Sequence, residues 1–253
     1  MSNKMINLEE IFIGSIPTTI VYPKSYEGNL PVIFIYHGWS SQKSVHENLG
    51  TLLACYGYFV VIPEAINHGS RGSIDYWDQT CGINYFWPTV ENSIKEYPII
   101  LNYILNNYPV DESRVGITGH SMGAITTSGI LAHHKNIKAA VTMDGSGAWK
   151  ELTLNLLGTE NIPDNSTFQN AINNVDLLSP LNNINNFKNT PLLLLHGEKD
   201  TVVPIKSDKI FFNALKEQYD FTDRLNMITF DRLNHYVTQA YINELISWFN
   251  KYL

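Results

Sequence analysis

The stretch Gly119-His120-Ser121-Met122-Gly123 constrains the fold of this chain more than any other feature, because of what flanks it. Residues 114–118 before it predict a short buried strand, and residues 124–132 after it predict a helix packed on a sheet. A serine between the two lies in so sharp a turn that a Cβ on residue 119 or 123 would collide with the strand or the helix. The sequence therefore predicts a strand–turn–helix unit that exposes the hydroxyl of Ser121.

The pentapeptide alone is a weak signal, but two partners follow it in the chain order Ser, Asp, His. Pro191–Gly197 is an apolar run that predicts a central parallel strand, and Asp200 lies in the loop after it. Residues 226–230 predict the next strand, and His235 lies in the loop that follows. Because such loops meet at one edge of a sheet, we expect His235 to accept the Ser121 proton and Asp200 to orient the imidazole.

A second carboxyl group competes for the role of the acid. Asp144 follows the strand predicted at 139–143, and from there it can in principle reach the same histidine. The pattern around position 200, in which His196-Gly197 precedes Asp200 and Val203-Pro204 follows it, favours Asp200.

The donors of an oxyanion hole have candidates as well. Leu30–Tyr36 predicts another buried strand, which His37 and Gly38 close. In a site of this kind one donor is the backbone N–H after the nucleophile, here Met122. The second comes from the loop after an early strand, here the N–H of Trp39. The alternative for His37-Gly38 is a plain turn that ends a strand.

Four stretches, residues 36–39, 67–71, 119–123 and 196–204, together with His235, resemble the α/β-hydrolases of the bacterial YitV/YjfP-like esterase group. That group is related to the prolyl-oligopeptidase and dienelactone-hydrolase branches. The resemblance implies a mostly parallel central sheet flanked by helices, and carboxylesterase activity on small acyl esters. One departure is Glu64, where relatives often carry Asp, so the role of the loop Glu64–Arg71 stays open.

Composition agrees with one enzyme domain spanning residues 1–253. Hydrophobic residues make up 44% of the chain and charged residues 16%, which is typical of a globular protein. A net charge of −7 without a basic block argues against nucleic acid and anionic membranes as partners. The sequence shows no metal-ligand spacing and no glycine-rich nucleotide motif, so we expect neither a metal nor a cofactor. Cys55 and Cys81 form no motif and are expected to be reduced; residues 1–7 lack a signal-peptide core, so we expect a cytoplasmic location.

Strand-like runs alternate with helical segments along the chain. Ile16–Tyr22 predicts an early edge strand, and residues 58–63 predict a further strand. Helices are predicted at residues 45–56, 90–107 (interrupted at Pro98), 205–219 and 237–252. The segment 145–189 is too long for a plain connection, so we interpret it as a small helical lid over the site; the alternative is a surface excursion.

Other histidines are weaker candidates for chemistry. We expect His120 to be a buried packing residue and His196 to be a turn residue in the acid loop, while His68 lies near the crevice. Three functional classes remain: a carboxylesterase, a serine peptidase of the prolyl-oligopeptidase type, and a non-catalytic binding protein. The complete set of candidates for Ser, Asp and His favours an enzyme, and the lack of room for a gating domain favours the esterase.

Overall fold

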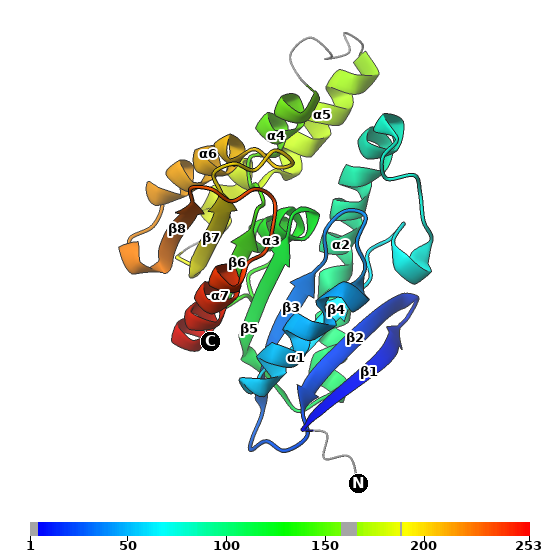
Figure 1. The fold of residues 1–253 in the computed structure, drawn as a ribbon, viewed down its shortest axis with the longest axis vertical. Helices are drawn as coiled ribbons and strands as arrows, with labels where there is room; N and C mark the ends of the chain where they lie inside the picture. Colours follow the sequence, from blue (N-terminus) through cyan, green and yellow to red (C-terminus); the bar gives the residue numbers. More distant parts are fainter. Residues whose placement is uncertain (1–4, 158–165, 188) are drawn as a thin grey trace.

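An eight-stranded sheet forms the centre of the computed structural model, which describes residues 5–157, 166–187 and 189–253 (Figure 1). Its strands are β1 (Ile6–Ile13), β2 (Ile16–Pro23), β3 (Leu30–Tyr36), β4 (Phe59–Pro63), β5 (Val110–His120), β6 (Ala139–Met143), β7 (Leu192–Gly197) and β8 (Leu225–Phe230). They lie side by side in the order β1-β2-β4-β3-β5-β6-β7-β8. All neighbours from β4 to β8 pair in parallel, whereas β2 pairs antiparallel with β1 and β4. The mostly parallel sheet predicted from the sequence is confirmed.

Helices cover both faces of this sheet. They are α1 (Glu47–Cys55), α2 (Gln79–Asn107), α3 (Met122–His133), α4 (Trp149–Leu157), α5 (Ser166–Leu178), α6 (Ile205–Lys216) and α7 (Gln239–Tyr252), with short 3-10 turns η1 (Lys43–His46), η2 (Gly69–Arg71), η4 (Pro180–Asn186) and η5 (Thr222–Arg224). One core lies between the sheet and α2, α3 and α6, and a second core lies between the sheet and α1 and α7 (Figure 1). Successive residues of β3 alternate between them, because Phe34 joins the first core and Ile35 the second. That double burial explains why the parallel strands read as unbroken apolar runs.

The strand predicted at the edge of the sheet is in fact the second strand from that edge. Ile16–Tyr22 is a strand, but β1 pairs along the whole of β2 and takes the edge instead. β1 is half exposed and carries Glu9 and Glu10 on its surface, so it lacks the apolar run that reveals an inner strand. Exposed charges are typical of edge strands, where they discourage pairing with other chains.

Helix α2 is longer than the sequence predicts. It begins at Gln79 rather than at residue 90, and it continues through both Pro88 and Pro98. A proline in a helix interior removes a backbone donor and costs about 3 kcal/mol. Tyr97 and Ile104 on the same helix are fully buried, and this packing outweighs the local penalty. Among the described residues, no helix combines the length and the apolar character needed to cross a membrane.

The predicted lid segment, residues 145–189, contains α4, α5 and η4. Trp149 and Leu152 of α4 are completely buried in the core that also holds α3 and α6 (Figure 1). The segment is therefore attached to the first core through α4. Its role as a lid stays a prediction. Residues 158–165 and 188 of this segment lie outside the described residues, as do residues 1–4, which contribute to the expected location, and the side chain of Cys81.

The turn that carries Ser121 generates a stability prediction. A Cβ on Gly123 would lie 1.9 Å from the carbonyl oxygen of Tyr36, a backbone atom that cannot give way as the end of a flexible side chain can. We expect Gly123→Ala to lower the free energy of unfolding by more than about 4 kcal/mol, measured by urea denaturation followed by circular dichroism. Gly14→Ala is the control: its Cβ would meet open space, so the expected loss of about 1–2 kcal/mol comes from its positive φ of 60° alone. Equal losses in the two variants would contradict the close approach of α3 to β3.

Candidate active site

Ser121 occupies a strained turn between β5 and α3. Its φ of 58° lies in the left-handed region that side chains rarely adopt. The Ser121 N–H donates to the carbonyl of Met143 at 2.9 Å, which ties the turn to the end of β6. A Cβ on Gly119 would lie 2.3 Å from the carbonyl of Gly123, so both glycines are needed where the sequence predicts them. The strand–turn–helix unit predicted around Ser121 is therefore present.

His235 and Asp200 lie in contact, although they come from loops after different strands. The Nδ1 of His235 is 2.7 Å from Oδ2 of Asp200. The other oxygen of Asp200 accepts the N–H groups of Val202 and Val203, each at 2.8 Å. Burial alone would raise the pKa of Asp200, but the hydrogen bonds from His196, His235 and the Val203 amide outweigh it and hold this pKa well below its usual range. The carboxylate stays ionised, as an acid that orients a histidine must.

The loop that carries His235 lies directly on the loop that carries Asp200. A Cβ on Gly197 would be 2.5 Å from the carbonyl oxygen of Leu233, so only glycine permits this approach. The Oδ1 of Asn234 accepts the N–H of Thr201 at 2.9 Å and that of His235 at 2.8 Å. Asn234 therefore joins the two loops. Sequence reasoning missed it, and its only signal is its place directly before the histidine.

His196 is not the turn residue that the sequence analysis expects. It belongs to β7, is fully buried, and lies with Nδ1 3.0 Å from Oδ2 of Asp208 and Nε2 2.9 Å from the carbonyl of Val203. Burial alone would lower the pKa of His196. The hydrogen bonds to Asp200 and Asp208 have the larger, opposite effect and raise this pKa to about 10. The carbonyl of Val203 requires a proton on Nε2, and the raised pKa favours a second proton on Nδ1, next to Asp208. This cation lies behind Asp200 and helps to keep its carboxylate charged.

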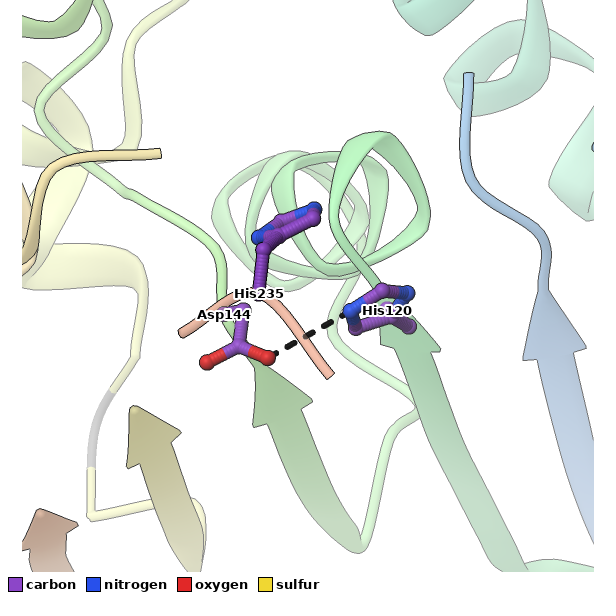
Figure 2. A group of neighbouring side chains, drawn as sticks. All are labelled: His120, Asp144 and His235. Atoms are coloured by element: carbon purple, nitrogen blue, oxygen red, sulfur yellow. Dashed lines mark ion pairs between the residues drawn. The ribbon is translucent and has the colours of Figure 1, made fainter. Parts of the chain in front are cut away.

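Asp144, the competing acid, is engaged elsewhere. Its Oδ1 accepts the hydroxyl of Tyr241 at 2.8 Å and the N–H of Gly197 at 3.0 Å. Its Oδ2 lies 3.3 Å from Nε2 of His120 (Figure 2). The geometry thus pairs His235 with Asp200 and leaves Asp144 to a separate contact.

His120 differs from its expected role as a packing residue. It is only half buried, and its ring lies beside that of His235 with the centroids 4.7 Å apart. A position directly before the serine places this ring at the carboxyl end of β5, where the pocket begins. The residue is therefore part of the site's surface rather than of the core.

The predicted oxyanion loop runs alongside Ser121. A Cβ on Gly38 would lie 3.4 Å from the Cβ of Ser121, so Trp39 follows at the edge of the site. The indole Nε1 of Trp39 donates to the carbonyl of Tyr76 at 3.2 Å, which holds the ring against the loop 67–76. Met122 is the first residue of α3, where backbone N–H groups have no partner within the helix. The oxyanion roles of Trp39 and Met122 stay predictions.

The loop Glu64–Arg71 supports the oxyanion loop from behind. Glu64 is buried, and its Oε1 accepts the N–H of Lys43 at 2.9 Å and lies 3.2 Å from Nε2 of His37. Arg71 donates to the carbonyl of Glu64 at 2.9 Å and pairs with both oxygens of Glu96. These contacts hold the loop in place through one part-buried ion pair, Arg71 with Glu96, and through the bond from Arg71 to the Glu64 carbonyl.

His68, the remaining histidine near the crevice, has a structural position. Its Nδ1 donates to the carbonyl of Ile66 at 2.8 Å, and its Nε2 accepts the N–H of Ser40 at 3.3 Å. The side chain is completely buried, and burial lowers the pKa of His68 to about 4. A neutral ring that accepts the N–H of Ser40 positions the residue next to Trp39.

A cavity of about 610 Å³ opens beside Ser121. Its walls come from the oxyanion loop, η1, α1, the ends of β5 and β6, and the loop before α7, and none of its lining residues is Asp, Glu, Lys or Arg. The lining residues are Gly38, Trp39, Ser41, Val45, His46, Asn48, Leu49, Leu52, His120, Ser121, Met143, His235, Tyr236, Val237 and Ile242. None of the described residues of the segment 145–189 is among them, so the walls of this cavity come from other elements.

The fold and the site define an α/β-hydrolase. A solved structure of the same fold, TT1662 from Thermus thermophilus, superposes with a TM-score of 0.79 over 98% of both chains at 17% identity. This chain belongs to the prolyl oligopeptidase family, whose model matches residues 50–253.

Two relatives narrow the class further. Esterase YjfP of Escherichia coli (strain K12) is 30% identical over 259 residues, which cover 98% of this chain and 100% of that protein. YitV of Bacillus subtilis (strain 168), whose name marks its esterase activity as inferred, is 31% identical over 258 residues with the same coverage. The chain is a serine hydrolase, which removes the non-catalytic binding protein from the three classes.

The contact between His235 and Asp200 generates a second prediction. Asp200→Asn is expected to lower kcat by up to about 10⁴-fold, because an amide holds the imidazole in the wrong tautomer. Asp144→Asn is the matched control, since its retained Oδ1 still accepts from Tyr241 and Gly197; its loss of kcat should be far smaller. Steady-state kinetics of both variants test this, with circular dichroism to confirm folding. A severe loss in Asp144→Asn with a mild one in Asp200→Asn would reverse the assignment.

Proposed function

We propose that this protein is a carboxylesterase that hydrolyses small, uncharged acyl esters through an acyl-enzyme intermediate. The observation that carries the proposal is the pairing of His235 with Asp200 at 2.7 Å on the same cavity that Ser121 lines. Strain at Ser121 supports it, because backbone conformations of this kind cluster at functional sites. The esterase name of a full-length relative points to the same chemistry.

The proposed reaction has two halves. The Oγ of Ser121 attacks the ester carbonyl carbon while Nε2 of His235 takes its proton. The resulting oxyanion accepts the N–H groups of Trp39 and Met122. Collapse of the tetrahedral intermediate breaks the bond to the alcohol, which leaves with the proton held by His235. Water then attacks the acyl-serine, gives its proton to His235, and the carboxylic acid departs as Ser121 recovers its proton.

The cavity walls support a neutral substrate. Apolar side chains such as Leu49, Leu52 and Ile242 form part of the lining, and no charged side chain among the lining residues is available to pair with a substrate carboxylate or ammonium. An unpaired charge in such surroundings costs several kcal/mol. The same cost argues against peptides with a charged terminus as substrates. It does not apply to a peptide whose termini are blocked.

Ser121→Ala tests the mechanism. The variant is expected to lose turnover of 4-nitrophenyl acetate and butyrate almost completely, because no other group can carry the acyl intermediate. Ser44→Ala, an exposed serine of η1, is the control and should keep the wild-type rate. Hydrolysis by Ser121→Ala at a rate near that of the wild type would remove the proposed mechanism.

A comparison of substrates separates the two enzymatic classes. An esterase of this kind should turn over 4-nitrophenyl butyrate and leave the 4-nitroanilide of a blocked dipeptide untouched. A kcat/KM for the anilide equal to or above that for the ester would make the peptidase the better description. Both substrates release a nitroaromatic product, so both rates are measured by absorbance.

The uncharged cavity generates a further prediction. Mono-4-nitrophenyl succinate and 4-nitrophenyl butyrate have acyl chains of similar length, but only the first carries a carboxylate. We expect kcat/KM for the succinate ester to be at least about 100-fold lower, because its carboxylate finds no partner in the cavity. Equal values at several ionic strengths would show that a cationic group reaches the acyl site.

A further inference from the structure

Three side chains of types that can bind a metal ion lie close together (Figure 2). His120 ends β5, Asp144 follows the neighbouring strand β6, and His235 lies beside them on the loop before α7 (Figure 2). One ligand atom from each residue lies within 4.8 Å of the other two. The group combines two imidazoles with one carboxylate, a donor set that zinc accepts.

Two of these donors are buried without a hydrogen-bond partner. Nε2 of His120 and Oδ2 of Asp144 are both inaccessible to solvent, and the 3.3 Å between them lacks hydrogen-bond geometry. Asp144 as a whole is completely buried. Native proteins leave few buried polar atoms unpaired, so a pair of them aimed at one point needs an explanation. A shared cation would satisfy both.

The surroundings hold the carboxylate in the orientation that a ligand requires. Oδ1 of Asp144 is fixed by the Tyr241 hydroxyl at 2.8 Å and by the Gly197 N–H at 3.0 Å. Oδ2 is thereby left to face His120. Supporting hydrogen bonds of this kind are usual behind metal-ligating carboxylates and histidines.

The position of the group and the spacing of its ligand atoms also fit a zinc site. His120 and His235 both line the cavity, so the group lies at the cavity wall. Zinc ligands at about 2.0–2.1 Å from the metal lie about 3.3 Å from one another in a tetrahedron. The distance between His120 and Asp144 already has this value, at 3.3 Å. His235, with a ligand atom within 4.8 Å of one from each of the other two residues, supplies the third position.

We propose that His120, Asp144 and His235 form an inhibitory site for Zn²⁺. Asp200 holds Nδ1 of His235, so the ion takes Nε2, the atom that receives the Ser121 proton in the proposed mechanism. Zinc bound there blocks proton transfer and hydrolysis stops. Mg²⁺ and Ca²⁺ do not substitute, because they select oxygen ligands in larger number. The inhibitory effect rests on the proposed function, whereas the binding does not.

Binding is tested first, on the inactive Ser121→Ala protein, by competition with a chromophoric zinc chelator. We expect one Zn²⁺ per chain, and an affinity at least about tenfold lower when His120→Gln or Asp144→Asn is added, since each removes one ligand. His133→Gln, a change at an exposed histidine far from the cavity lining, is the control and should leave the affinity unchanged. Two ligand variants keep the test valid where one folds poorly. Unchanged affinity in both would overturn the site.

Inhibition is tested next, with Zn²⁺ added to the active enzyme and removed by EDTA. The concentration of Zn²⁺ that halves the rate should rise at least about tenfold in His120→Gln, each protein being referred to its own uninhibited rate. Mg²⁺ at the same concentrations should have no effect. Zinc binding at this site without loss of esterase turnover would overturn the inhibitory role. A protein that bound zinc as expected but hydrolysed no ester would instead refute the proposed function and leave the binding site standing.

Discussion

The close approach of helix α3 to strand β3 is the constraint on which the site depends. Gly123 leaves no space for a Cβ against the Tyr36 carbonyl, and this contact fixes where the chain must turn after β5. Ser121 is consequently held at a φ of 58°, a conformation that costs about 1–3 kcal/mol and persists only where its surroundings impose it. The bond from its N–H to Met143 secures the turn on the other side. In the proposed mechanism, a nucleophile held in this way needs little reorganisation when an ester binds.

Charge is distributed around the site in layers. None of the described residues that line the cavity is Asp, Glu, Lys or Arg, while Asp200 lies behind His235 and the buried His196 lies behind Asp200. Asp208 of α6 lies on the other side of His196, with its Oδ2 3.0 Å from Nδ1. Burying several charges is expensive unless each finds a partner, and here each does. The arrangement keeps a full negative charge next to the imidazole without exposing it to the substrate.

Sequence reasoning succeeded where a single local pattern decides the structure. β3, β6 and β7 are buried on both faces, so each appears in the sequence as a largely apolar run. The two glycines around Ser121 predict the tight turn. The contact of Asp200 with His235 follows from chain order and the rule that parallel strands end at one edge.

Other features depend on register and on packing between distant segments, which no local pattern encodes. β1 was hidden by its charged, half-exposed surface, and α2 continues through two prolines because its buried face outweighs their cost. The role of Asn234 emerges only once two loops are stacked. The contact of His120 with Asp144 requires the ends of β5 and β6 side by side, so the sequence pattern gave no sign of it.

The most direct test of this account is to locate the reactive serine by mass spectrometry after treatment with a fluorophosphonate, a reagent that modifies activated serines. The account predicts one phosphonyl group per chain, on the peptide that contains Ser121, with esterase activity lost in proportion to labelling. It also predicts almost no labelling of a His235→Ala variant, because the serine then lacks its base. Labelling of a different residue, or labelling of His235→Ala at the wild-type rate, would contradict it.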